Sequence, residues 1–206
     1  MKYILFLLFL VFNFYSHAQH ITQKTFSKED ISSISIHGKY VFKITVDAKP
    51  VSEITVHSRV EGENNENIVL VTEAKNNHLY IAIKQQPLFV DANDKLSAHK
   101  VISVEINVLI PEHLSMGIDL YESDLIVKGV YDKVRVHSDT GNCIFTAFQG
   151  SARIDTRNGN VAMQTNHAKV SAASKNGYIK KEEIDAGNQE VLIKTINGNI
   201  TITKSQ

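Results

Sequence analysis

The sequence predicts an all-β protein, and three observations lead to that class. Apolar side chains recur at every second position in several segments, as in strands that bury one face. Turn-forming Asn, Gly and Pro residues separate these segments, and helical periodicity of useful length is missing after residue 18. From residue 112 onward one pattern recurs five times, which indicates a repeat architecture.

The first 18 residues are predicted to be a secretory signal peptide. Lys2 supplies a short positive start, residues 3–12 are apolar, and Ser16 and Ala18 place small residues at the −3 and −1 positions of a cleavage site. A membrane anchor is the alternative, but this run is far shorter than the roughly 20 residues that span a bilayer. Gln19 follows the predicted cut, and because it is not a cysteine we expect no lipid anchor there. The sequence therefore predicts export to the periplasm or the cell surface, with no transmembrane span in the mature chain.

The charge balance argues against nucleic acid as a partner. The chain has 22 basic and 22 acidic residues. Removal of residues 1–18 takes away Lys2 and no acid, so 21 basic and 22 acidic residues remain, a net charge of −1. A nearly neutral chain with interspersed charges gives no electrostatic footprint for DNA or RNA.

Residues 19–111 are predicted to form an irregular β-strand region. Residues 21–27 show no strong pattern, and residues 61–67 are predicted to be an exposed acidic loop rather than a calcium site. Residues 85–100 are the longest irregular stretch, and Pro111 ends the last strand because proline cannot donate to an interior ladder. Strands are expected at residues 34–36, 40–46 (with Tyr40, Phe42, Ile44 and Val46 on one apolar face), 54–56, 68–72, 79–84 and 102–110.

Residues 112–206 carry the repeat and are expected to continue the first region as one domain. Three sets of positions define it. The zero positions are separated by 18, 18, 18 and 21 residues and are Ser123, Gly141, Gly159, Gly177 and Gly198. The −5 positions are Ile118, Val136, Ile154, Ala172 and Ile193, and the +2 positions are Leu125, Cys143, Val161, Ile179 and Ile200. Cys143 therefore belongs to an apolar row, and we expect it to be a core residue rather than a reactive thiol.

Two folds fit this repeat. Asn-Gly pairs at 158–159, 176–177 and 197–198, with further breaks near residues 149–150, 166–167 and 186–187, are typical of an antiparallel meander of hairpins. A meander, however, has no need for an 18-residue period, whereas stacked coils do. The sequence thus favours a parallel β-helix-like solenoid, with each coil on the preceding one, glycines at φ > 0 in the corners and irregular N-terminal strands capping one end. Asn142, Asn160 and Asn199 are expected to hydrogen-bond from coil to coil, and residues 201–206 to close the other end.

The signal peptide, the variable strands, the strand that ends at Ile110-Pro111 and the Asn-Gly-Asn corners together resemble a bacterial group. They are similar to the exported putative adhesins that include the head GIN domain of putative auto-transporter adhesins. Residues 196–200 are the best match, and Ser123 departs from the glycine pattern. The resemblance implies a right-handed β-helical fold, export and a role in adhesion, and it supplies no catalytic residues.

The sequence shows no constellation for catalysis, metal binding or cofactor binding, so each of these is predicted to be absent. Nine histidines lack the paired spacings of zinc sites, and the corner asparagines lack the paired glycines and recurring aspartate of calcium rolls. Exposed aromatics for a sugar surface are sparse, with Tyr121, Tyr131 and Tyr178 as candidates. Charges on neighbouring coils that are expected to line one wall are Asp119, Glu122, Asp124, Arg135, Asp139, Arg153, Asp155 and Arg157.

The leading hypothesis is an exported, non-enzymatic β-solenoid that presents a flat polar surface to a cell-envelope or extracellular protein or glycan. The binding residues stay unknown at this stage. A carbohydrate-active enzyme, such as a polysaccharide lyase or hydrolase, is the first alternative, because β-helices also carry such activities. A periplasmic structural scaffold is the second alternative. The irregular fourth coil, with Tyr178 and Lys181, is the first place to look for a partner.

Overall fold

The computed structural model describes residues 20–62, 67–86 and 102–205. The predicted signal peptide, most of the acidic loop and most of the irregular stretch after residue 85 lie outside the described residues. Within them, the all-β class is confirmed: the chain forms one continuous mixed sheet of 15 strands and one 3-10 turn, η1 (Lys28–Asp30). None of the helices in this part of the chain has the length and apolar character needed to cross a membrane.

The strands vary in length from three to seventeen residues. In chain order they are β1 (His20–Ser27), β2 (Ser33–His37), β3 (Lys43–Lys49), β4 (Glu53–Glu61), β5 (Ile68–Lys75), β6 (His78–Gln85), β7 (Ser103–Pro111), β8 (Ser115–Glu122), β9 (Asp124–Thr140), β10 (Cys143–Asn158), β11 (Val161–Thr165), β12 (Ala168–Ser174), β13 (Ile179–Lys181), β14 (Gln189–Asn197) and β15 (Ile200–Lys204).

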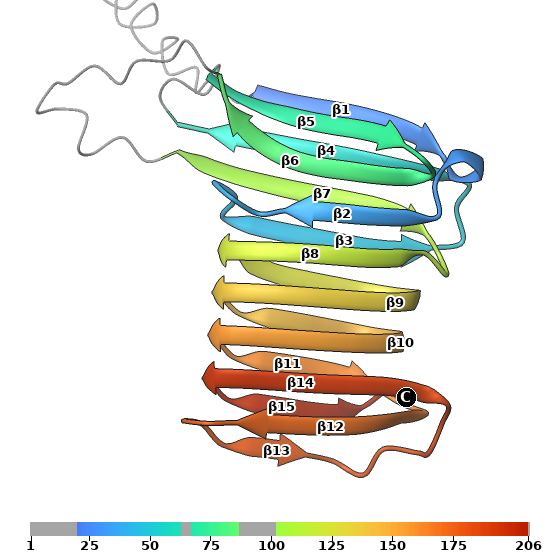
Figure 1. Ribbon diagram of the computed structural model, residues 1–206, viewed down its shortest axis with the longest axis vertical. Helices are drawn as coiled ribbons and strands as arrows, with labels where there is room; N and C mark the ends of the chain where they lie inside the picture. Colours follow the sequence, from blue (N-terminus) through green and yellow to red (C-terminus); the bar gives the residue numbers. More distant parts are fainter. Residues whose placement is uncertain (1–19, 63–66, 87–101, 206) are drawn as a thin grey trace, which may run out of the picture.

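The sheet doubles back on itself because two long strands bend. The first half of β9 pairs with β3 and its second half with β8, and β10 pairs with β11 and β14 in the same way. Two layers result, and they enclose the core in a nearly closed, barrel-like arrangement (Figure 1). The back layer runs β1-β4-β7-β3-β9-β10-β11-β15-β13 and the front layer runs β5-β6-β2-β8-β9-β10-β14-β12.

In the repeat, strands pair in parallel with residues 18 positions away. Leu125 pairs with Cys143 and Cys143 with Val161, while Val134 pairs with Ala152. These pairings contradict the antiparallel meander. The breaks near residues 150 and 167 are bends from one layer into the other, and Gly150 (φ 135°) and His167 (φ 53°) supply the left-handed backbone there.

The last two units do not stack in chain order. β14 lies between β10 and β12, and β15 lies between β11 and β13, so the fifth unit occupies the place next to the third (Figure 1). The expectation that each coil stacks on the preceding one is therefore wrong here, and β15 does not close the stack.

Hydrophobic burial explains this order. The inward side chains of the fifth unit are all apolar and fully buried, namely Val191, Ile193, Ile200 and Ile202. The fourth unit places a smaller Ala172 and a charged Lys181 at the matching offsets, and Ile179 is 43% exposed. Because the interior slot buries both sides of a strand, the more apolar unit gains more there, at roughly 25 cal/mol per Å² of apolar surface.

The glycines at the zero positions are required for a reason other than the predicted one. Gly159, Gly177 and Gly198 do not have positive φ, and among these corner glycines only Gly141 does (φ 125°). The backbones of neighbouring corners instead approach so closely that a Cβ on Gly159 would clash with the carbonyl oxygen of Gly141. A Cβ on Gly198 would clash with the carbonyl of Gly159 in the same way, so the corners form a column in which side chains do not fit.

Two predictions in the N-terminal region need correction. Residues 20–27, which show no pattern, form β1 along the edge of β4, because main-chain hydrogen bonds do not require apolar alternation. The predicted strand at residues 40–46 begins only at Lys43. Tyr40 has φ 67° and is 53% exposed, Phe42 is 59% exposed, and the buried residue between them is Val41. The remaining predicted strands are present, and Asn76 and Asn77 form the two-residue turn between β5 and β6 (φ 51° and 58°).

Candidate binding surface

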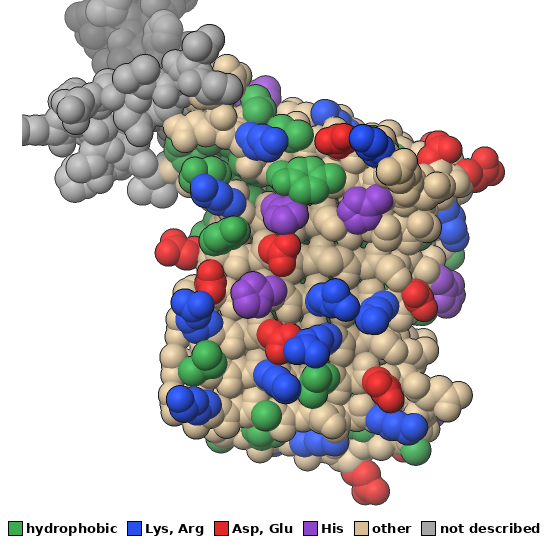
Figure 2. Space-filling model, in the orientation of Figure 1, with side chains coloured by type: hydrophobic (Ala, Val, Ile, Leu, Met, Phe, Trp, Pro, Cys, Tyr) green, Lys and Arg blue, Asp and Glu red, His purple; other side chains and the backbone are tan. Residues whose placement is uncertain are grey.

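The outward side chains of the front layer form a continuous surface, which we call the polar face. It consists of β8, β9 from Lys133 onward, β10 from Ser151 onward, β14 and β12 (Figure 2). Of the charged residues expected on one wall, this face holds six: Asp119, Arg135, Asp139, Arg153, Asp155 and Arg157. The other two lie at the corner, since Glu122 ends β8 and Asp124 begins β9.

The part of this face over β9, β10, β14 and β12 is basic although the whole chain is neutral. Figure 2 shows blue basic side chains gathered over these strands. In residues 133–140, 151–158, 168–175 and 189–197, seven cations (Lys133, Arg135, Arg153, Arg157, Lys169, Lys175 and Lys194) stand against three carboxylates (Asp139, Asp155 and Glu190). Basic side chains that are interspersed with acidic ones along the sequence are therefore concentrated on this part of the folded protein.

Two of these carboxylates are already neutralised by neighbours. Arg153 Nε lies 2.8 Å from Asp155 Oδ2, and Arg157 Nη2 lies 3.5 Å from Asp139 Oδ1. Within the described chain, Arg135 and Lys194 take part in no ion pair. The polar face therefore has positive charge that is not compensated by its own acids.

The arginines at the centre of the face repel one another. Arg135 and Arg153 are directly paired across β9 and β10, and like charges in such positions destabilise a sheet. They line a hollow of about 420 Å³ together with Asp132, Lys133 and Glu190. Asp155 is ion-paired with Arg153, whereas Arg135 has no ion-pair partner in the described chain.

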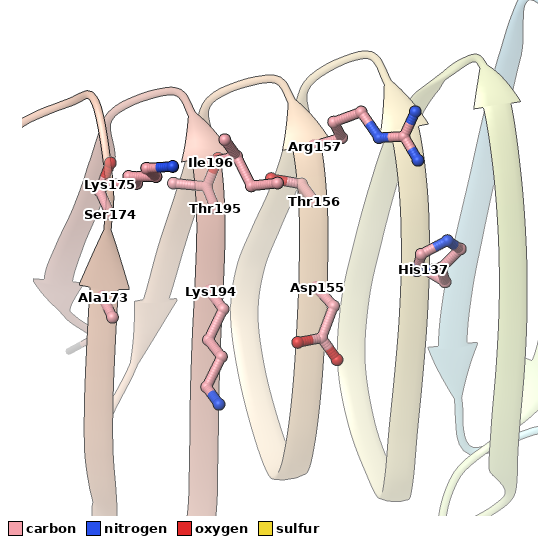
Figure 3. Close-up of a pocket in the computed structure, with 10 residues that line it drawn as sticks. All are labelled: His137, Asp155, Thr156, Arg157, Ala173, Ser174, Lys175, Lys194, Thr195 and Ile196. Carbon is pink, nitrogen blue, oxygen red and sulfur yellow. The ribbon is translucent and has the colours of Figure 1, made fainter.

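A second hollow, of about 520 Å³, lies beside the first and extends toward the turns. Figure 3 shows Asp155 and Lys194 extending from the neighbouring strands β10 and β14, with Arg157 and Ile196 closer to the turns. Ile196 is 44% exposed. Asp155 is the one carboxylate that lines this hollow. Its Oδ2 contacts Arg153 Nε at 2.8 Å, and the hollow has no second carboxyl group for paired acid–base chemistry.

The asparagine row hydrogen-bonds from unit to unit, as expected. Asp124 Oδ1 accepts the backbone N–H of Asn142 (2.8 Å), and the side-chain oxygen of Asn142 accepts that of Asn160 (3.2 Å). The side-chain oxygen of Asn160 in turn accepts the N–H of Asn199 (2.9 Å), and that of Asn199 accepts the N–H of Tyr178 (3.1 Å). These asparagines thus have a structural role, and the ladder follows the spatial order of the units rather than the chain order.

The remaining single-residue candidates are distributed as follows. Cys143 is fully buried, as predicted, and burial, assisted by the charge of Asp124, raises the pKa of its thiol to about 12. Tyr131 cannot contact a sugar, because it is 2% exposed and stacks on Phe148 with ring centroids 5.7 Å apart. Tyr121 (49%) and Tyr178 (63%) are exposed. Groups of three or more His, Cys, Asp or Glu side chains suited to a metal ion are not found among the described residues.

Sequence reasoning missed Tyr40 and Phe42 as surface residues. Their spacing with Ile44 and Val46 fits strand alternation, and nothing local marks the break in register. The one available signal was Gly38, two residues before Tyr40, since glycine often marks a loop.

Comparison with known proteins identifies the fold. A putative cell adhesion protein from Clostridium sporogenes has 13% sequence identity and a TM-score of 0.64, with 91% of this chain and 100% of that chain covered. Putative adhesins from Bacteroides fragilis (11% identity, TM-score 0.39) and Parabacteroides distasonis (12% identity, TM-score 0.33) match over 89% of this chain and 97% of theirs. TM-scores below 0.5 support no further conclusion, so the likeness to the clostridial protein carries the comparison, and it concerns the fold alone.

No family model matches the sequence. No curated protein matches it either.

Proposed function

We propose that this protein is an exported, non-enzymatic binding protein of the bacterial cell envelope, of the adhesin type that contains the head GIN domain. In this proposal residues 1–18 are a signal peptide, residues 19–111 form the irregular region and residues 112–206 form a right-handed parallel β-helix-like solenoid that the irregular strands cap. The shared fold with a putative cell adhesion protein and the parallel pairing of residues 18 apart support it.

The polar face is the proposed binding surface, and its partner is acidic. One observation carries this conclusion: Arg135 and Arg153 stand side by side on neighbouring strands with carboxylate compensation for Arg153 only. An anionic group between them would remove the repulsion that the free protein retains. Arginine forks bind carboxylates, sulfates and phosphates with two parallel hydrogen bonds, which suits a ligand that lies flat on a sheet.

The proposal is tested by binding of the purified protein to immobilised dextran sulfate, with uncharged dextran as the reference matrix, at about 0.15 M salt so that only close charge pairs contribute. We expect Arg135→Ala together with Lys194→Ala to weaken binding at least about tenfold, which corresponds to about 1.4 kcal/mol. The matched control is Lys28→Ala together with Lys180→Ala, which removes two exposed cations outside the polar face. Equal losses in both double variants would contradict a specific polar-face site.

The enzymatic alternative has one specific observation in its favour. Glu122 and Asp139 together line a further hollow of about 480 Å³ beside the end of β8, and glycoside hydrolysis requires two carboxyl groups. Asp139 is engaged with Arg157, which favours binding over catalysis. Incubation with polysaccharides and assay of released reducing ends or unsaturated products decides the point. Turnover that Glu122→Gln abolishes would replace the non-enzymatic proposal.

The place of action is tested separately. Protease treatment of intact cells should cleave the protein if it is a surface adhesin and should leave it intact if it is a periplasmic scaffold. A panel of peptidoglycan and extracellular matrix proteins, added to the binding assay, then narrows the class of partner.

A further inference from the structure

Four aromatic side chains from three separate segments gather where β8 ends, and we call this group the aromatic corner. It consists of Tyr40 and Phe42 in the loop before β3, Tyr80 on β6 and Tyr121 on β8. Tyr40, Phe42 and Tyr121 are 53%, 59% and 49% exposed. A single exposed aromatic residue needs no explanation, but a contiguous group of them marks a binding site more often than it marks packing.

Two hollows flank these rings. One has a volume of about 480 Å³ and is lined by Tyr40, Phe42 and Tyr121, and the other has a volume of about 340 Å³ and is lined by Tyr40, Tyr80 and Tyr121. Tyr40 and Tyr121 contribute to both, so they stand between two adjacent subsites. A ligand that fills both hollows must therefore be extended and must pass across these two rings.

The backbone of Tyr40 is strained. Its φ of 67° lies in the left-handed region, which a large side chain occupies rarely and only at a cost in free energy. The ring of Tyr40 is still half-exposed, so packing of that ring in the core does not account for the strain. The Lys39 ammonium lies 5.0 Å from the ring centroid, within the range of a cation–π contact.

A buried hydroxyl holds this loop in place. Ser123, which is 1% exposed, shares its one hydroxyl proton between the carbonyl of Gly38 (3.1 Å) and that of Val41, the residues on either side of Lys39 and Tyr40. The N–H of Gly38 donates to the carbonyl of Asp119 (2.8 Å), and that of Phe42 donates to the carbonyl of Val104 (2.8 Å). The loop is thus fixed at both ends before any ligand arrives, which lowers the entropy lost on binding.

This arrangement explains the departure of the first repeat from glycine. A Cβ on Gly38 would lie 3.0 Å from Leu120 and 3.1 Å from the Ser123 hydroxyl oxygen, so the absence of a side chain on Gly38 lets the Ser123 hydroxyl approach the loop without crowding. The unit that faces the aromatic loop has the hydroxyl that the loop needs, whereas the units that follow in the stack have glycine. The substitution is therefore part of the construction of the site.

The lining identifies the ligand class. Polar groups alternate with the rings: Lys39, Glu122, Asp139 and Thr140 line the larger hollow, and His37, Lys84 and Gln85 line the smaller one. An apolar helix or acyl chain would bury these polar groups without partners, which costs free energy for each one. A pyranose ring has C–H faces that stack on tyrosine and hydroxyls that pair with such polar groups around its edge.

We propose that the aromatic corner is a saccharide-binding site that takes a neutral oligosaccharide of at least two pyranose units, with Tyr40 and Tyr121 as the stacking platforms between the two hollows. This inference goes beyond the proposed function, because it assigns a second ligand to the end of β8 and the loop before β3, and the hollows there are not lined by Arg135, Arg153 or Lys194. Its ligand is uncharged, whereas the polar face is proposed to bind an acidic partner.

The test is isothermal titration calorimetry with cellohexaose, chitohexaose and mannohexaose as probes. We expect at least one of them to bind the purified protein, and we expect Tyr121→Ala to weaken that binding at least about tenfold. Tyr40→Gly should weaken it similarly without unfolding the protein, because glycine adopts the left-handed backbone freely. Tyr178→Ala removes a tyrosine that is even more exposed (63%) at the far end of the stack and should leave binding unchanged.

Two results would overturn the inference: no heat of binding with any of the three probes, or binding that both Tyr40→Gly and Tyr121→Ala leave intact. The Arg135→Ala and Lys194→Ala double variant separates this site from the polar face. It should lose affinity for dextran sulfate and keep its affinity for the hexasaccharide.

Discussion

The repeat and the region before it belong to the same sheet but differ in how their strands pair. From β9 onward the described strands pair in parallel, and equivalent residues of each unit meet in rows of glycine, asparagine and aliphatic side chains. Before β9, antiparallel pairs such as β1–β4 and β5–β6 alternate with parallel pairs such as β2–β8. The regular part builds a flat surface, whereas the irregular part builds loops that project side chains out of the sheet.

This difference explains why the two candidate sites differ in character. The polar face arises from strict register, because residues at the same offset of successive units stand side by side. The aromatic corner arises where register is interrupted, in the loop between β2 and β3 that contacts the first repeat unit through Ser123. Regular stacking thus places charged side chains in rows on the polar face. Where the stacking is interrupted, the loop before β3 and the end of β8 form the hollows that the aromatic side chains line.

The largest effect is expected from a test of the unit order. Ala162 and Thr201 are paired across β11 and β15, so cysteines at both positions should form a disulfide. Cysteines at 162 and 180 should not, because Lys180 pairs with Thr201 on the opposite side of β15, about 9.6 Å away at 4.8 Å per strand. Electrophoresis without reductant, or peptide mass spectrometry, measures the result, and a crosslink between 162 and 180 would restore the consecutive order.

The glycine column gives the next largest effect. Gly159→Ala should lower the free energy of unfolding by about 3 kcal/mol, because its Cβ has no room beside the Gly141 carbonyl. Gly117→Ala is the matched control, since the nearest atom to its Cβ would be the Ser35 hydroxyl at 3.8 Å. This control should be neutral or slightly stabilising in urea denaturation. Similar losses in the two variants would mean that the column does not limit side-chain size.

The hydrogen bonds from Ser123 to the loop before β3 are expected to contribute less to the free energy of unfolding than the glycine column does. Ser123→Ala leaves the carbonyl of Val41 without its donor, whereas the carbonyl of Gly38 keeps the N–H of Val41 (3.2 Å), and we expect a loss of about 1–3 kcal/mol. Ser138→Ala is the control, because the Ser138 hydroxyl is buried in the repeat and has no hydrogen-bond partner in the described chain. Urea midpoints of the two variants compare them directly. A larger loss for Ser138→Ala would show that the loop before β3 is not held through Ser123.

The smallest effect concerns the segment that carries the chain from the fourth unit back to the fifth. Hydrogen bonds from Lys204 and Asn166 lower the pKa of the Asp185 carboxyl. A lowered folded-state pKa stabilises the protein above the ordinary value near 3.8, and this contribution disappears as the pH falls through the lowered value. Asp185→Asn should therefore reduce the urea midpoint slightly at about pH 6 and by less at about pH 2.5.

Glu183→Gln serves as the control for this pH dependence, since Glu183 is exposed in the same segment and has no ion pair among the described residues. It should show no difference from the unmodified protein at either pH. A reduced midpoint for Asp185→Asn that persists undiminished at low pH would indicate a steric effect of the amide and not the loss of a charged hydrogen bond.

Several features of the site were accessible from the sequence. The 18-residue spacing predicted that Arg135 and Arg153 would be neighbours, and β9 and β10 pair them. The apolar row that contains Cys143 predicted its burial. The proximity of Tyr40 and Tyr121 could not be predicted in this way. The two residues are 81 positions apart, and Tyr40 lies in a loop that does not belong to the repeat.

The class of fold, the period of the stack and the inward face of the strands with clear apolar alternation follow from the sequence alone, because alternation and turn chemistry act over a few residues. The tertiary structure decided the order of the last two units, since strands with the same apolar offsets can exchange places until burial selects between them. It also decided that Tyr40 and Phe42 point outward, because the side of the chain that is buried depends on Ser123 and Val104 from distant segments.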